Sequence, residues 1–175
     1  MKKYYLLLMI LATLKFSGIA GTDNVVEVRK LFYLASESSS KSDDFLEKML
    51  FIEDDSLGVH KGYLAMAYML KAKHAWNPYN KLKFFHKGRD LLEAQIKNHS
   101  TSIELKFLRY CIQSNAPFFL GYSNEVESDK NYIVDHYITD LDDDLKWRIK
   151  KYFIDSKDLS KEEKKTLSEK LWTTM

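Results

Sequence analysis

Cysteine, proline and glycine are scarce in this 175-residue sequence, which has one Cys, two Pro and six Gly. A single cysteine excludes an intramolecular disulfide framework and any metal site built from several thiolates. So few prolines and glycines argue against a turn-rich β-sandwich, and the abundant Leu, Lys, Glu and Asp favour helices. With 45% hydrophobic and 30% charged residues, the composition is that of one ordinary globular domain rather than a disordered chain.

Sequence motifs for catalysis and for metal binding are also missing. The sequence has no Gly-rich phosphate loop, nucleophile elbow or dinucleotide fingerprint, and no two of its five histidines are spaced to share a helix face. Cys111 falls on the apolar stripe of a predicted helix, so we expect a buried, inert thiol. The acidic run at 140–144 lacks the turn glycine and closing Glu of a calcium loop and is expected to start a helix. We predict a protein that is not an enzyme and has no catalytic residue, metal or cofactor.

Residues 1–20 have the pattern of a secretory signal peptide. Two lysines at the start precede an apolar run over 4–14, and the small residues of the triplet 18–20 (Gly-Ile-Ala) fit a cleavage site. The apolar run is shorter than the roughly 20 residues that span a bilayer. We therefore expect cleavage near Ala20, a periplasmic or secreted protein, and no stable membrane anchor.

Cleavage would also change the charge balance. Residues 1–20 contain three lysines and no acid, so their removal lowers the basic residues from 27 to 24, against 25 acidic ones. A nearly neutral mature chain has no general electrostatic attraction for nucleic acid, and we predict no nucleic-acid partner.

The remaining sequence predicts an all-α domain of about seven or eight helices. Apolar residues recur at helical spacing in every segment. The expected helices cover about 24–35, 43–52, 57–76, 80–98, 101–116, 123–138 and 141–154, followed by a last helix capped by Ser160 and Glu163. We expect a helical domain over 21–155 and a C-terminal helix over 156–175, whose thin apolar content would let it pack loosely.

The helix over 57–76 is expected to be the most buried one. The run Tyr63–Leu70 is apolar on all sides, which a surface helix does not tolerate. Gly62, Ala65 and Ala67 are small enough to let neighbouring helices approach closely. After this helix, the Asn77–Pro78 pair interrupts the helical pattern, because proline disfavours helical backbone in the residue before it.

Six residues of the segment 85–100 resemble the second helix of a tetratricopeptide repeat: Phe85, Gly88, Leu92, Gln95, Ile96 and Ser100. The aromatic, small and large apolar positions match, whereas Gln95 and Ser100 stand where Ala and Pro are usual. Over about 28–137, the segments 75–78, 87–88, 107–109 and 115–122 look like an uncharacterised exported tetratricopeptide-like family of Bacteroidota-type bacteria. The resemblance implies antiparallel helical hairpins and an exported protein, and it implies no catalytic residue.

Six residues are candidates for binding a partner: Trp76, Asn77, Tyr79, Arg109, Gln113 and Tyr122. The first three lie at a predicted helix–helix corner, the next two lie one turn apart on a largely apolar helix, and Tyr122 ends an aromatic loop with Phe118 and Phe119. Helical repeats bind partners along a groove, and Arg, Trp and Tyr are common anchors there. The alternative is structural: the aromatics fill gaps between helices, and Arg109 caps loop carbonyls.

Together these patterns predict a non-catalytic interaction (adaptor) protein that holds an unknown protein or peptide. Two alternatives remain open. One is a periplasmic small-ligand-binding or accessory protein that uses apolar space beside the helix over 57–76. The other is an enzyme without a recognisable motif. The oligomeric state is not predicted.

Overall fold

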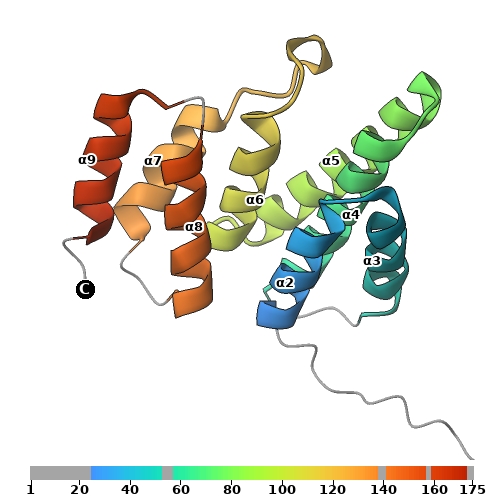
Figure 1. The fold of residues 1–175 in the computed structure, drawn as a ribbon, viewed down its shortest axis with the longest axis horizontal. Helices are drawn as coiled ribbons and strands as arrows, with labels where there is room; N and C mark the ends of the chain where they lie inside the picture. The colour runs from blue at the N-terminus through green and yellow to red at the C-terminus, as the bar shows by residue number, and fades with distance from the viewer. Residues whose placement is uncertain (1–24, 53–56, 138–140, 157–158, 173–175) are drawn as a thin grey trace, which may run out of the picture.

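The computed structural model describes residues 25–52, 57–137, 141–156 and 159–172. Within these ranges the chain is all-helical and has no β-strand, which confirms the all-α prediction (Figure 1). The predicted signal peptide at 1–20 lies outside the described residues. The helices are α2 (Val25–Ala35), α3 (Ser39–Phe51), α4 (Val59–His74), α5 (Pro78–Asn98), α6 (Ile103–Gln113), α7 (Val126–His136), α8 (Asp143–Asp155) and α9 (Lys161–Trp172), with a short 3-10 helix η1 (Phe118–Leu120). None of these helices is long and apolar enough to cross a membrane.

The middle of helix α4 is buried on all sides, as its sequence predicts. It packs against α2, α3, α5 and α6, and the whole run from Ala65 to Leu70 is buried. Two glycines allow this packing. Gly62 lies against the Leu105 side chain of α6, and a Cβ on Gly88 of α5 would lie 2.7 Å from the backbone oxygen of Ala65. Small residues therefore set how closely α4 meets its neighbours.

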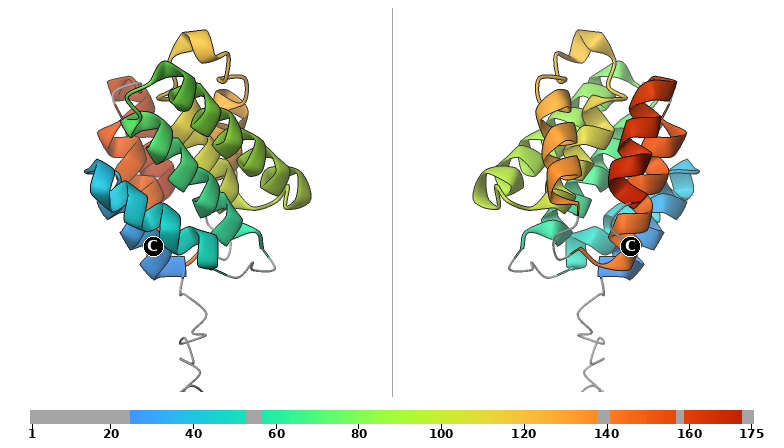
Figure 2. Two further views of the ribbon diagram at one scale, coloured as in Figure 1. Left: turned by 90° about the vertical axis from the view of Figure 1, so that its right-hand side faces the viewer. Right: turned by 90° about the vertical axis from the view of Figure 1, so that its left-hand side faces the viewer.

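The domain has two main hydrophobic clusters, and α6 contributes to both. In the ribbon, α6 lies between the α2–α5 side and the α7–α9 side, and Figure 2 shows these two sides in turn. Leu105 and Leu108 pack with α2–α5 in the first cluster, whereas Phe107 and Tyr110 pack with α7 and α8 in the second. Leu167 of α9 is buried in the second cluster, which places the C-terminal helix against the domain.

Side-chain caps explain where several helices begin. The predicted Ser160–Glu163 capping box is present: Glu163 N–H donates to Ser160 Oγ (3.1 Å), and Ser160 N–H donates to Glu163 Oε2 (2.9 Å). Asn77 Oδ1 accepts a hydrogen bond from the backbone N–H of Tyr79, and Pro78 is the first residue of α5. Proline is favoured there because its missing N–H needs no partner in the first turn.

For α3 and α6, the capping residue explains why the observed helix start differs from the expected one. Helix α3 begins at Ser39, four residues before the expected start, because Ser38 Oγ accepts a hydrogen bond from Lys41 N–H. Helix α6 begins at Ile103, two residues after the expected start: Thr101 and Glu104 have the spacing of a capping box, but Ser102 is the cap, and its Oγ accepts a hydrogen bond from Leu105 N–H. Glu104 is turned into the protein interior instead.

Glu104 belongs to a buried ion-pair cluster that joins three helices. Arg29 of α2 is 2% exposed, and its Nε and Nη2 donate to the two carboxylate oxygens of Glu104, each at 2.7 Å. Its Nη1 donates to Asp142 (2.7 Å) and Asp144 (3.2 Å) at the start of α8. The acids at 142–144 therefore start a helix, as predicted, and Asp142 and Asp144 also hold α8 to α2.

Candidate functional site

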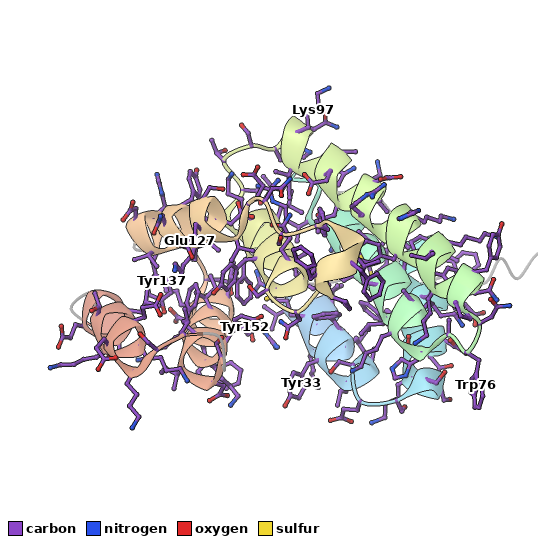
Figure 3. All side chains as sticks on the ribbon, turned by 90° about the horizontal axis from the view of Figure 1, so that it is seen from above. Tyr33, Trp76, Lys97, Glu127, Tyr137 and Tyr152 are labelled. Atoms are coloured by element: carbon purple, nitrogen blue, oxygen red, sulfur yellow. The ribbon has the colours of Figure 1, made fainter. Side chains whose placement is uncertain are left out.

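The six predicted partner-binding residues lie in two separate places. Trp76, Asn77 and Tyr79 are at the tip of the α4–α5 hairpin, where Trp76 is 99% exposed (Figure 3). Arg109, Gln113 and Tyr122 lie instead in a polar cluster that joins α5, α6 and the segment leading to α7. The predicted set is therefore not one site.

Arg109 makes ion pairs inside the domain. It is 7% exposed, and its Nε and Nη2 donate to the two carboxylate oxygens of Asp129 at 2.7 and 2.8 Å. Its Nη1 donates to Glu93 Oε2 at 2.9 Å. Burial alone would lower the pKa of Arg109, but the Asp129 and Glu93 carboxylates outweigh it and raise this pKa. Arg109 thus ties α5, α6 and α7 together; it neither lies on an open surface nor caps a loop carbonyl.

Gln113 and Tyr122 hold the segment between α6 and α7 in place. Gln113 is buried, and its Oε1 accepts a hydrogen bond from the backbone N–H of Glu125 at 3.0 Å. The Tyr122 hydroxyl donates to Glu93, and its ring packs edge-to-face on Phe85 at 5.8 Å. Burial and the Glu93 carboxylate raise the pKa of Tyr122. These contacts anchor the segment that carries η1, so its aromatic side chains have a fixed support.

An apolar groove lies between η1 and the α4–α5 hairpin, with a cavity volume of about 530 Å³. It runs along α4, where the ligand-binding alternative places an apolar space. The lining residues, which define the groove, are Phe32, Met66, Met69, Leu70, Ala72, Lys73, Pro78, Lys81, Leu82, Phe85, Ile112, Asn115, Ala116, Pro117, Phe119 and Leu120.

The groove has a packed apolar floor. Met69 and Ala72 of α4 and Phe85 of α5 form a small buried cluster, against which Leu120 and Tyr122 pack. This cluster is distinct from the two main ones, and it joins η1 to the α4–α5 hairpin. The floor is therefore part of the folded structure of the domain.

The rim of the groove exposes large apolar side chains. Leu82 is 42% exposed and Phe119 is 79% exposed, and beside them Phe118 is 96% exposed. Isolated exposed apolar residues are common, but a cluster of them around an apolar depression is a candidate binding site. The site residues proposed from the sequence included neither Leu82 nor Phe119. The sequence does contain a signal for Phe119, because two adjacent phenylalanines lie in a predicted loop between Pro117 and Gly121. In the structure, Gly121 has a left-handed backbone.

The polar groups of the groove lining are few and carry no negative charge. They are Lys73, Lys81 and Asn115, with no Asp, Glu, His, Ser or Cys among the lining residues. Asn115 Nδ2 donates to the backbone oxygen of Cys111 and to the Tyr152 hydroxyl, at 2.9 and 2.7 Å. Lys73 Nζ donates to the backbone oxygen of Ser36 at 3.0 Å. The lining is thus suited to binding apolar groups and offers no nucleophile paired with a base.

The described part of the chain does not bring potential metal ligands together, and its thiol is not activated. Among the residues that the structure describes, no three His, Cys, Asp or Glu side chains are placed to hold a metal ion. Burial raises the pKa of the Cys111 thiol, which disfavours the reactive thiolate.

Comparison with known protein families, characterised proteins and solved structures finds no match for this chain.

Proposed function

We propose that this protein is an exported, non-catalytic interaction module that binds an apolar segment of a partner protein in the apolar groove. The observation that carries the proposal is the groove: a depression of about 530 Å³ with an apolar floor and large apolar side chains exposed around its rim. Apolar surface that is covered on binding gives the main favourable free energy of association.

The exposed rim favours a macromolecular partner. Phe118 and Phe119 expose 96% and 79% of their surface, so much apolar area lies outside the cavity itself. A small molecule enclosed in the cavity would leave this area in water, whereas a protein segment lying along the groove would cover it. Aromatic residues at such positions are typical binding hot spots.

The six residues predicted from the sequence have different roles in this proposal. Tyr122 and Gln113 act as positioning residues, because they anchor the segment that presents Phe119. Arg109 stabilises the helices behind that segment. Trp76, Asn77 and Tyr79 adjoin Pro78, which lines the groove, and their exposed surface extends the contact area at the hairpin tip.

Site-specific crosslinking in the producing cell tests the proposal. In two test variants, a photoreactive amino acid replaces Leu82 or Phe119 on the rim. In the control variant it replaces Trp147 of α8, which is 57% exposed and does not line the groove. We expect the same partner protein to be crosslinked from both rim positions and not from position 147. N-terminal sequencing of the recovered protein tests export, with cleavage expected near Ala20.

A matched pair of variants shows whether the groove is responsible. Leu82→Gln/Phe119→Gln removes two exposed apolar rim residues, and Leu50→Gln/Phe51→Gln removes a Leu and a Phe of similar exposure on α3. Immunoprecipitation measures how much partner each variant retains. If only the first variant loses the partner, the groove is the binding site. Equal retention by both variants, or no crosslinked protein from either rim position, contradicts the proposal.

The cavity volume favours one second candidate, a small apolar ligand. About 530 Å³ lies within the roughly 300–1,000 Å³ of small-molecule sites in proteins. Native mass spectrometry of the protein purified from its own cells separates the two functions. A bound small molecule that is lost from a groove variant would support the ligand function, and a mass equal to that of the chain alone would contradict it.

A further inference from the structure

The groove is framed by a stretch of chain that carries positive charge only. Between Asp55 and Asp90 the sequence has no Asp or Glu and seven basic residues: Lys61, Lys71, Lys73, Lys81, Lys83, Lys87 and Arg89. This stretch forms α4 and the first half of α5, which make two walls of the groove. Since the whole sequence has 27 basic and 25 acidic residues, the positive charge here reflects local segregation.

Two of these cations face the groove and have no carboxylate partner in the described structure. Lys71 forms an ion pair with Asp43, and the Lys87 ammonium lies 4.2 Å from the centre of the Tyr68 ring. By contrast, Lys73 donates only to a neutral backbone oxygen, Lys81 is exposed, and both line the groove. The charged side chains that line the groove are therefore both positive, which favours an anionic partner.

We propose that the segment bound in the groove is an amphipathic helix with acidic residues beside its apolar face. This inference rests on the proposed function and specifies the chemistry of the partner. Apolar side chains of the helix would contact Met69 and Phe85 on the floor, and its flanking Asp or Glu residues would face Lys73 and Lys81.

The dimensions of the groove suit a short helix. The α4 wall runs from Met66 to Lys73 and the α5 wall from Pro78 to Phe85, so each wall is about 10 Å long, or two helical turns. A helix of that length presents two or three apolar residues at i, i+3 or i+4, and i+7, which is the usual spacing of helices bound in grooves. Within the described residues there is no strand edge to which an extended peptide could add. Methionine side chains such as Met66 adapt readily to different apolar surfaces.

Rim charges of this kind contribute selectivity more than affinity. Ion pairs at an exposed rim steer association and reject like-charged partners, and salt screens them. An acidic partner helix should therefore bind best at low ionic strength, whereas the apolar part of the affinity should be largely insensitive to salt.

Three synthetic peptides of 16 residues test the inference by fluorescence anisotropy with the purified protein. The first is an amphipathic helix with leucines at i, i+3, i+7 and i+10 and glutamates on both flanks. The second has lysine in place of each glutamate, and the third is the first in scrambled order. At low salt we expect the glutamate peptide to bind on the order of tenfold more tightly than the lysine peptide, and the scrambled peptide to bind more weakly than the glutamate one.

Charge reversal in the protein supplies the matched test. Lys73→Glu/Lys81→Glu should reverse the preference, so that the lysine peptide binds more tightly. Lys97→Glu/Lys165→Glu reverses two exposed lysines outside the groove lining and should leave the preference unchanged. Circular dichroism confirms that each variant is folded.

The outcomes separate this inference from the proposed function. Equal binding of the glutamate and lysine peptides would overturn the acidic preference and leave an apolar groove intact. Equal binding of the scrambled peptide would overturn the helical geometry. If no peptide binds while the rim positions still crosslink a partner in cells, the inference is wrong and the proposed function stands. If no peptide binds and no rim position crosslinks a partner in cells, both the inference and the proposed function are wrong.

Discussion

Arg29 in α2 binds Glu104 in α6 through two parallel hydrogen bonds of 2.7 Å, across 75 positions of sequence. Both side chains are buried, and the Tyr63 hydroxyl of α4 donates a third hydrogen bond to the same carboxylate at 2.9 Å. The pair, with Tyr63, therefore fixes α2, α4 and α6 relative to one another. A bidentate pair of this kind is geometrically specific as well as strong.

Arg29→Met should destabilise the protein by about 3–5 kcal/mol, because it leaves the buried Glu104 carboxylate without its cation. Urea unfolding followed by circular dichroism measures the loss. The double variant Arg29→Met/Glu104→Gln removes both charges and keeps an acceptor for Tyr63, so we expect it to recover much of the loss. A double variant no more stable than Arg29→Met would show that the unpaired charge is not the cause.

Asp142 should make the free energy of unfolding depend on acid pH. Burial opposes ionisation of Asp142, but hydrogen bonds from Arg29 and from the backbone N–H of Leu145 outweigh it and lower the pKa of this carboxyl. A lowered folded-state pKa contributes stability above the unfolded value of about 3.9, and this contribution is lost as pH falls through the folded value.

Asp142→Asn tests this contribution, because Asn keeps the helix cap and removes the charge. The difference in unfolding free energy between the wild type and this variant should be largest above about pH 5 and should shrink as the pH falls below 4. Asp143→Asn, at an exposed position of the same first turn, is the control. A difference that stays constant from pH 6 to pH 2 would rule out the pairing with Arg29 as its source.

Gly88→Ala should destabilise the protein even though alanine is the better helix former. The added Cβ would lie 2.7 Å from the Ala65 backbone oxygen and close to Met69, so α4 and α5 must move apart. We expect a net loss of about 1–3 kcal/mol from overpacking. Ala94→Gly, at an exposed position of the same helix, calibrates helix propensity and should cost about 1 kcal/mol. Unchanged or increased stability of Gly88→Ala in thermal unfolding would contradict the close contact.

The local features of this fold were largely predictable from sequence, and the long-range polar contacts were not. Apolar periodicity predicted the helices, and the all-apolar run at 63–70 predicted the burial of α4, because both depend on residues within a few turns of one another. From the sequence, Glu104 fits a capping box with Thr101 as well as it fits a buried ion pair. Only the folded chain brings Arg29 of α2 to it. Likewise, Arg109 on an apolar helix was equally consistent with a binding anchor until α7 placed Asp129 beside it.

The candidate site was partly predictable for the same reason. The aromatic residues at 76, 79 and 118–119 can be identified in the sequence. Which of them border the groove depends on how η1 lies relative to the α4–α5 hairpin. Leu82 has no distinguishing sequence signal, since an exposed leucine and a buried one fit the helical pattern of α5 equally well.

Arg109→Met separates the structural role of this residue from a direct role in binding. It leaves the buried Asp129 carboxylate without its bidentate partner, so we expect a loss of about 3–5 kcal/mol in urea unfolding. Arg109 does not line the groove, so the folded variant should still crosslink the partner from position 82 at the wild-type yield. Full stability with loss of the crosslink would instead make Arg109 a binding residue and contradict its assignment here. Phe119→Gln is the converse control: Phe119 is 79% exposed, so stability should change by less than about 0.5 kcal/mol while partner binding falls.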